Sequence, residues 1–123
     1  MSEKNFTVTV DIAAAPVATK IEAVAAEYEG KYTMNNEVYK RLLNTYKKFR
    51  KFALQNDGGI KNTDVYGVDK VKIVAEVPAV DLFREGLDLF SELLAMVDSI
   101  DVSASKSGDL IIEVSVAGLW KAV

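Results

Sequence analysis

The sequence predicts an α+β domain of two layers, a four-stranded, largely antiparallel sheet with three helices on one face. Two observations carry this prediction. Short segments alternate strictly between hydrophobic and polar residues, which is typical of strands with one buried face. Between them, hydrophobic residues recur at helical spacing, giving the order β-α-α-β-α-β-β. With 123 residues, half of them hydrophobic, the chain suits a single domain over residues 1–123.

Four segments carry the strand pattern. Residues 6–12 place Phe, Val, Val and Ile on one face, and residues 70–77 repeat the alternation. Residues 99–105 and 110–116 lie on either side of "KSGD", a glycine-containing hairpin turn. Each strand has only one apolar face, so we expect antiparallel pairing with the other face open to solvent.

Three segments carry the helix pattern. The first is expected to start at Pro16, which suits a first helical turn, and to stop at Gly30. The second covers residues 37–55 and follows "TMNN", which offers capping side chains. A polar loop is expected over residues 56–69. The third helix is expected from Pro78 to about Val97.

Positive charge is concentrated on the second helix, although the net charge of the chain is −3. On a helical wheel most of the aromatic residues of "YKRLLNTYKKFRKF" lie on the apolar side, and Arg50 intrudes there. The cations on the opposite side, with Phe52 beside them, form the predicted basic face: Lys40, Arg41, Lys47, Lys48 and Lys51. Because the rings and the charges do not interleave, this pattern weakens a nucleic-acid interpretation.

The third helix shows the opposite charge. Carboxylates recur at i, i+4, i+7 and i+11 and form an acidic stripe: Asp81, Glu85, Asp88 and Glu92. Like charges four residues apart repel, so a basic partner would stabilise the stripe. Three interpretations stay open. The two charged faces are solvated, they pair within or between subunits, or they bind external ligands.

The chain ends in "AGLWKAV", which contains its only tryptophan, Trp120. One interpretation is a tail that packs over the end of the core. The other is an aromatic anchor at a partner interface, where tryptophan is enriched.

Several chemistries are not expected. The chain has no His and no Cys, so neither a Ser-His-Asp nor a Cys-His arrangement can form. Ser103 and Lys106 match S-x-x-K only as four letters on a strand, and a calcium-loop match that starts at Asn62 fails at its last position, Ile73. We therefore expect no enzyme, no catalytic residues, no metal, no cofactor and no small-molecule substrate. With neither a secretory signal nor a membrane span evident, we expect a cytoplasmic location.

The function predicted from these features is that of a non-catalytic binding or regulatory protein that acts through protein–protein contacts. The partner is another protein or a second copy, as a homodimer, and no membrane is expected. The expected contact elements are the basic face, the acidic stripe and Trp120. The alternative is a nucleic-acid-binding protein that sets residues 37–55 against phosphates, with affinity that falls steeply with salt.

Overall fold

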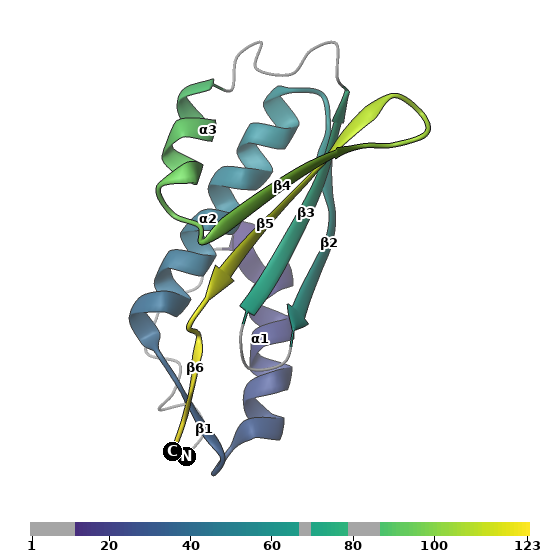
Figure 1. The fold of residues 1–123 in the computed structure, drawn as a ribbon. Coiled ribbons are helices and arrows are strands. Elements are labelled where there is room, and N and C mark those ends of the chain that lie inside the picture. The colour runs from purple at the N-terminus through teal and green to yellow at the C-terminus, as the bar shows by residue number, and fades with distance from the viewer. Residues whose placement is uncertain (1–11, 67–69, 79–86) are drawn as a thin grey trace.

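The computed structural model of the chain describes residues 12–66, 70–78 and 87–123 (Figure 1). The elements follow in this order: η2 (Ile12–Ala14, a 3-10 helix), α1 (Ala15–Tyr28), β1 (Tyr32–Met34), α2 (Asn36–Gln55), β2 (Gly59–Tyr66), β3 (Lys70–Pro78), α3 (Leu87–Leu94), β4 (Ser99–Ala104), β5 (Asp109–Ala117) and β6 (Trp120–Ala122). The α+β class is confirmed.

The larger sheet has four strands in the order β2-β3-β5-β4, and each neighbouring pair is antiparallel. Figure 1 shows the helices gathered on one side of it, with α3 alongside α2. The β4–β5 hairpin closes where predicted, with Gly108 at a φ of 91°, a left-handed conformation that glycine adopts without strain.

The core lies between this sheet and the helices. The alternation predicted for the 70–77 segment is confirmed, because every second residue of β3 is at most 1% exposed: Val71, Ile73, Ala75 and Val77. The neighbouring strand β5 adds Ile112, Val114 and Val116 to the same face. The other face of β3 and β5 carries the ion pair between Lys72 and Glu113, at 3.3 Å.

Helix α2 runs through the middle of the helical layer. It begins at Asn35, whose side chain accepts hydrogen bonds from the amides of Glu37 and Val38, as capping requires. Its apolar side is buried against the sheet and α3, as the wheel predicts for most of its members: Tyr39, Leu42, Leu43, Tyr46, Phe49 and Ala53.

The prediction of a loop over residues 56–69 is wrong, because β2 occupies Gly59–Tyr66 and pairs with β3. A β-bulge between Ile60 and Asn62 shifts the register and breaks the two-residue alternation that would have revealed this strand. Among residues 59–65 of β2, the buried residue is Thr63, which is polar, and this further weakens the pattern.

Two other boundaries differ from the prediction. Of the strand expected at 6–12, residues 6–11 lie outside the described residues, and Ile12 belongs to η2 and is 89% exposed. The third helix ends at Leu94, not at about Val97, because Met96 donates to the Leu93 carbonyl in a tight turn. Pro78 is the last residue of β3, and residues 79–86 lie outside the described residues.

A second, two-stranded sheet of β1 and β6 was not predicted. Its strands are antiparallel, and Met34 pairs with Trp120. The chain reaches β6 from β5 through Gly118, at a φ of 84°. The Asn35 amide donates to the Leu119 carbonyl at 2.8 Å, so this small sheet is joined to the start of α2.

Candidate functional site

The basic face of α2 is the principal candidate surface. Lys40, Arg50 and Lys51 are exposed, and Arg41, Lys47 and Lys48 are half-buried. Within the described part of the chain, Lys40, Arg50 and Lys51 form no ion pair. Three cations of α2 are therefore directed to solvent, two of them adjacent in sequence in the last turns of the helix.

Two other cations of α2, Lys48 and Arg41, contact residues of α3 and of the turn that follows it in the same chain. The Lys48 Nζ donates to the Glu92 carboxylate at 3.1 Å. Arg41 lies 3.6 Å from Asp98 and donates to the Met96 carbonyl at 3.1 Å. The opposite-charged helices thus pair within one chain at Lys48, one of the interpretations left open by the sequence.

Asp98, which pairs with Arg41, is also held by hydrogen bonds to β5. Its carboxylate also accepts a hydrogen bond from the Ala117 amide, at 2.7 Å, and its own amide donates to the Ser115 carbonyl. Arg41 therefore contributes to fixing the turn between α3 and β4, which leaves it less available for a partner than Lys40 or Lys51.

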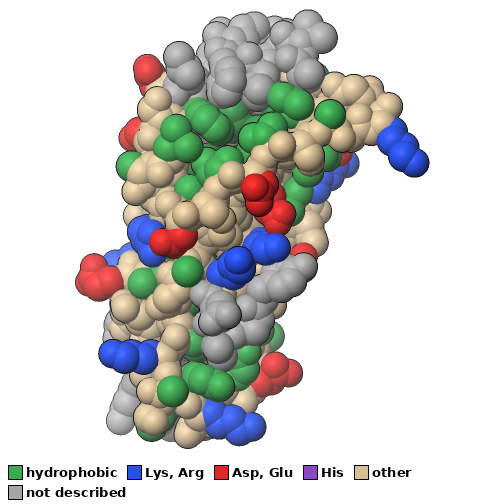
Figure 2. All heavy atoms as spheres, viewed as in Figure 1, with side chains coloured by type: hydrophobic (Ala, Val, Ile, Leu, Met, Phe, Trp, Pro, Cys, Tyr) green, Lys and Arg blue, Asp and Glu red, His purple; other side chains and the backbone are tan. Residues whose placement is uncertain are grey.

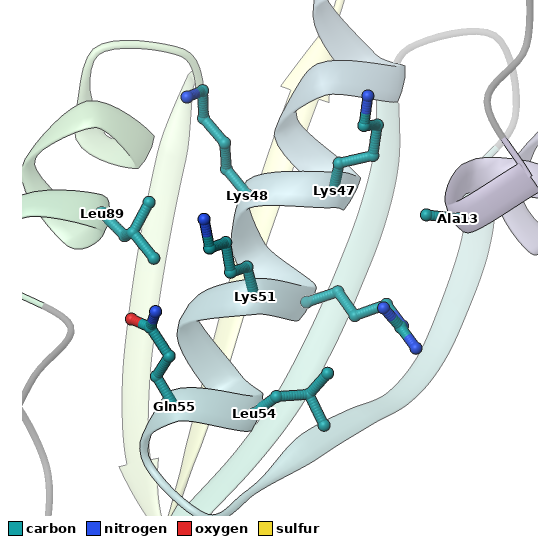
Figure 3. Close-up of a pocket in the computed structure, with 8 residues that line it drawn as sticks. Ala13, Lys47, Lys48, Lys51, Leu54, Gln55 and Leu89 are labelled. Carbon is teal, nitrogen blue, oxygen red and sulfur yellow. The ribbon is translucent and has the colours of Figure 1, made fainter.

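A groove of about 590 Å³ runs along the C-terminal half of α2. Figure 3 shows Lys47, Lys48 and Lys51 extending from α2, with Leu89 facing them from α3 and Ala13 on the other side. The lining residues are Ala13, Lys47, Lys48, Arg50, Lys51, Leu54, Gln55 and Leu89. Four of the eight are cations, and the rest are apolar apart from Gln55. The groove is therefore suited to an anionic ligand that also has an apolar side.

Five of these eight residues were not predicted as site residues: Ala13, Arg50, Leu54, Gln55 and Leu89. Leu54 was placed on the buried side of the helix by the wheel, yet it is 52% exposed. The reason is that α3 packs on the side of α2 that carries Phe52. The buried part of α2 therefore includes Phe52 and leaves Leu54, on the other side of the helix, exposed. Arg50, noted as a cation on the apolar arc, sits beside Leu54 in the groove, and that anomaly was the available signal in the sequence.

Phe52 does not lie on the surface as the wheel suggested. It is completely buried. The centroid of its ring lies 6.4 Å from that of Phe49 and 5.2 Å from that of Phe90 in α3. The other rings of α2, on Tyr39, Tyr46 and Phe49, are at most 5% exposed. Helix α2 therefore offers no ring to a ligand, and Phe52 is corrected from a contact residue to a core residue.

The acidic stripe is only partly described. Asp81 and Glu85 lie outside the described residues. Asp88 is exposed, and Glu92 is the carboxylate that pairs with Lys48. The described half of the stripe thus consists of one exposed carboxylate and one that is already paired.

Trp120 packs over the end of the core. Trp120 is 8% exposed. Its ring contacts the Tyr28 ring edge-on, with 5.1 Å between the ring centroids. This arrangement is the first of the two interpretations of the tail, and it leaves Trp120 little area to offer a partner.

Other chemistry is sparse in the described residues. No three His, Cys, Asp or Glu side chains among them come together as ligands for a metal ion.

Burial, with a smaller effect of the Glu22 charge, raises the pKa of Tyr39 to about 12. No helix in the described ranges combines the length and the apolar character needed to cross a bilayer.

Comparison of the chain with family models, with curated proteins and with solved structures gives no match.

Proposed function

We propose that this chain is a cytoplasmic, non-catalytic binding protein that holds an acidic segment of a partner protein in the groove on α2. The observation that carries the proposal is the lining of that groove, in which Arg50 and Lys51 are exposed and border Leu54 and Leu89. A partner helix with carboxylates along one edge and leucine-like side chains along another would complement both kinds of lining.

Charge and apolar contact are expected to act together in this groove. Exposed ion pairs contribute little by themselves, usually less than about 1 kcal/mol each. Burial of Leu54, which is 52% exposed, supplies an apolar contribution that salt does not screen. The proposed complex should therefore weaken, without vanishing, when the salt concentration is raised.

The alternative is a nucleic acid held by its phosphates against the same cations. It would have to bind without stacking on α2, because the rings of that helix are buried in the core. Its affinity would depend on salt more steeply than that of a peptide, since each phosphate contact releases counterions. This difference separates the two candidates experimentally.

The test is a fluorescence-anisotropy titration with a labelled synthetic helix that carries Glu on one edge and Leu on the other. The double variant Arg50→Glu with Lys51→Glu should bind it at least about tenfold more weakly, because two attractions become repulsions. The matched control is Lys31→Glu with Lys121→Glu, which makes the same change in net charge at exposed positions of the small-sheet region. That control should bind nearly as the wild type does.

Two results would count against this proposal. Equal loss of affinity in both double variants would mean that only net charge matters. Tighter binding of a labelled single-stranded DNA than of the peptide, with a steep salt dependence, would favour the nucleic-acid alternative.

A further inference from the structure

The sheet has two outer strands, β2 and β4. Among the described strands, β4 pairs with β5 alone, over six residues from Ser99 to Ala104. A strand in this position presents a row of backbone groups that another strand can bind. Which strand it can accept depends on the direction of those groups and on the side chains beside them.

The direction of the β4 backbone groups follows from the hairpin. The Ser105 amide donates to the Asp109 carbonyl at 2.8 Å, toward β5. Because hydrogen-bonding direction alternates along an antiparallel strand, Ser103 and Asp101 also face β5. The amides and carbonyls of Ile100, Val102 and Ala104 therefore face outward, away from the sheet.

The two edges are protected very differently. On β2 a bulge interrupts the edge between Ile60 and Asn62, and the Lys20 side chain of α1 donates to the Thr63 carbonyl. Both are devices that discourage further strand pairing. Strand β4 has the sequence SIDVSA, with no lysine, no proline and no bulge within its paired register.

Apolar side chains accompany the outer edge of β4, with which no other described strand pairs. Val102 of β4 is 53% exposed and Leu94 of α3 is 52% exposed, and Ile100 and Leu110 are half-buried. Figure 2 shows hydrophobic side chains gathered between α3 and the β4–β5 hairpin. A partner at this edge would cover apolar surface as well as satisfy backbone groups.

We propose that a second copy of this chain binds here, with its β4 antiparallel to the first β4 and Val102 directly opposite Val102 of the partner subunit. This register pairs Ile100 with Ala104 of the partner subunit, so all three outward-facing residues of each strand find an outward-facing counterpart. It also keeps both apolar faces on the same side of a continuous eight-stranded sheet.

Charge selects this register and a two-fold partner. With Val102 at the centre, Asp101 lies opposite Ser103 of the partner subunit, a neutral residue that can donate a hydrogen bond. Moving the centre to Asp101 would set two carboxylates against each other and lose one of the three outward pairs. Moving it to Ser103 would also lose a pair. The strand is therefore complementary to itself in one register.

This inference goes beyond the proposed function and uses a different surface, because β4 and α3 residue Leu94 are not among the residues that line the α2 groove. The interface depends on backbone hydrogen bonds and apolar contact. Its stability should therefore not fall as salt is raised, in contrast to a dimer formed through oppositely charged helices.

The first measurement is the mass in solution by light scattering at about 0.5 mM protein, at low and high salt. The expected mass is twice the 13.5 kDa of one chain at both salt concentrations. Val102→Glu should give the single-chain mass with an unchanged circular dichroism spectrum. Leu54→Glu, at a residue that is equally exposed but lies in the α2 groove, should stay dimeric.

The second measurement tests the register. The chain contains no cysteine, so Val102→Cys introduces a single thiol. Directly opposed residues in a hydrogen-bonded pair have Cα atoms about 5.5 Å apart, which a disulfide can bridge. Oxidised glutathione should convert Val102→Cys to a covalent dimer, whereas Leu54→Cys should stay a single chain.

A wild-type chain that is monomeric at this concentration, with no covalent dimer from Val102→Cys, would overturn the proposal. A dimer that persists in Val102→Glu, or that dissociates at high salt, would place the interface elsewhere and would overturn it equally. None of these results depends on whether the α2 groove binds an acidic peptide, so the two proposals can fail separately.

Discussion

Tyr39 shows how burial alters the chemistry of a single residue in this core. Its side chain lies on the apolar side of α2 and is completely buried. Burial disfavours the phenolate, and the negative charge of Glu22 disfavours it further, so the pKa rises from 10.0 to about 12. The folded protein therefore holds this proton at pH values where the unfolded chain has released it.

The consequence is a loss of stability in alkali. The contribution of Tyr39 is fully present below pH 10 and is lost as the pH rises from 10 to 12. Over that interval it should lower the free energy of unfolding by at most about 1.4 kcal/mol per pH unit. Tyr39→Phe should reduce the slope of the free energy of unfolding against pH, measured by urea titration.

If Tyr39→Phe and the wild type have the same slope, the account of Tyr39 is contradicted.

At the scale of elements, Gly58 sets how closely the end of α2 approaches the sheet. A Cβ at this position would lie 2.1 Å from the Glu76 carbonyl oxygen and 2.8 Å from the Val77 Cα, both backbone atoms of β3. The Gly58 amide also donates to the Ala53 carbonyl at 2.7 Å. Helix and strand thus meet at a residue that cannot carry a side chain.

Gly58→Ala should therefore destabilise the fold by about 1–3 kcal/mol, because the backbone of β3 must shift to relieve the overlap. The adjacent Gly59→Ala is the control, since a Cβ there meets nothing within 4 Å, and it should change the free energy of unfolding by less than about 0.5 kcal/mol. Equal effects of the two variants in urea titrations would contradict this packing.

Elements with a strict pattern were predictable from the sequence, and those whose pattern is interrupted were not. Strand β3 and most of the buried side of α2 follow directly from their periodicity. Strand β2 was missed because its bulge adds a residue to the alternation and because its buried member Thr63 is polar. Strands β1 and β6 have three residues each, too few to show a period.

The candidate site was predictable only in its charges. The cations of α2 could be assigned to one face from their spacing alone. The exposure of Leu54 and the burial of Phe52 could not, because both depend on which edge of α2 is covered by α3. Contacts between helices distant in the sequence are not encoded in the period of either one.

At the scale of the whole molecule, two surfaces of different character lie on different elements. The groove on α2 combines cations with apolar side chains, and the outer edge of β4, the last of the described strands in the sheet, combines backbone groups with Val102. A two-fold dimer through β4 would carry two copies of the groove. A partner with two acidic segments could then bind both, with a gain in apparent affinity that needs no new contact.

Amide chemical shifts, recorded by NMR while the acidic Glu-Leu helix is titrated into the protein, locate the surface of the protein that the helix contacts. If the helix binds in the groove, the amide signals of residues 47–55 of α2 and those around Leu89 of α3 should shift, because these residues line the groove. The amide chemical shift of Lys72 should not change, because its side chain lies on the face of β3 that points away from the helices. The same is expected for the other β3 residues on that face. Shifts concentrated on that face, or no shifts at about 1 mM peptide, would contradict the account.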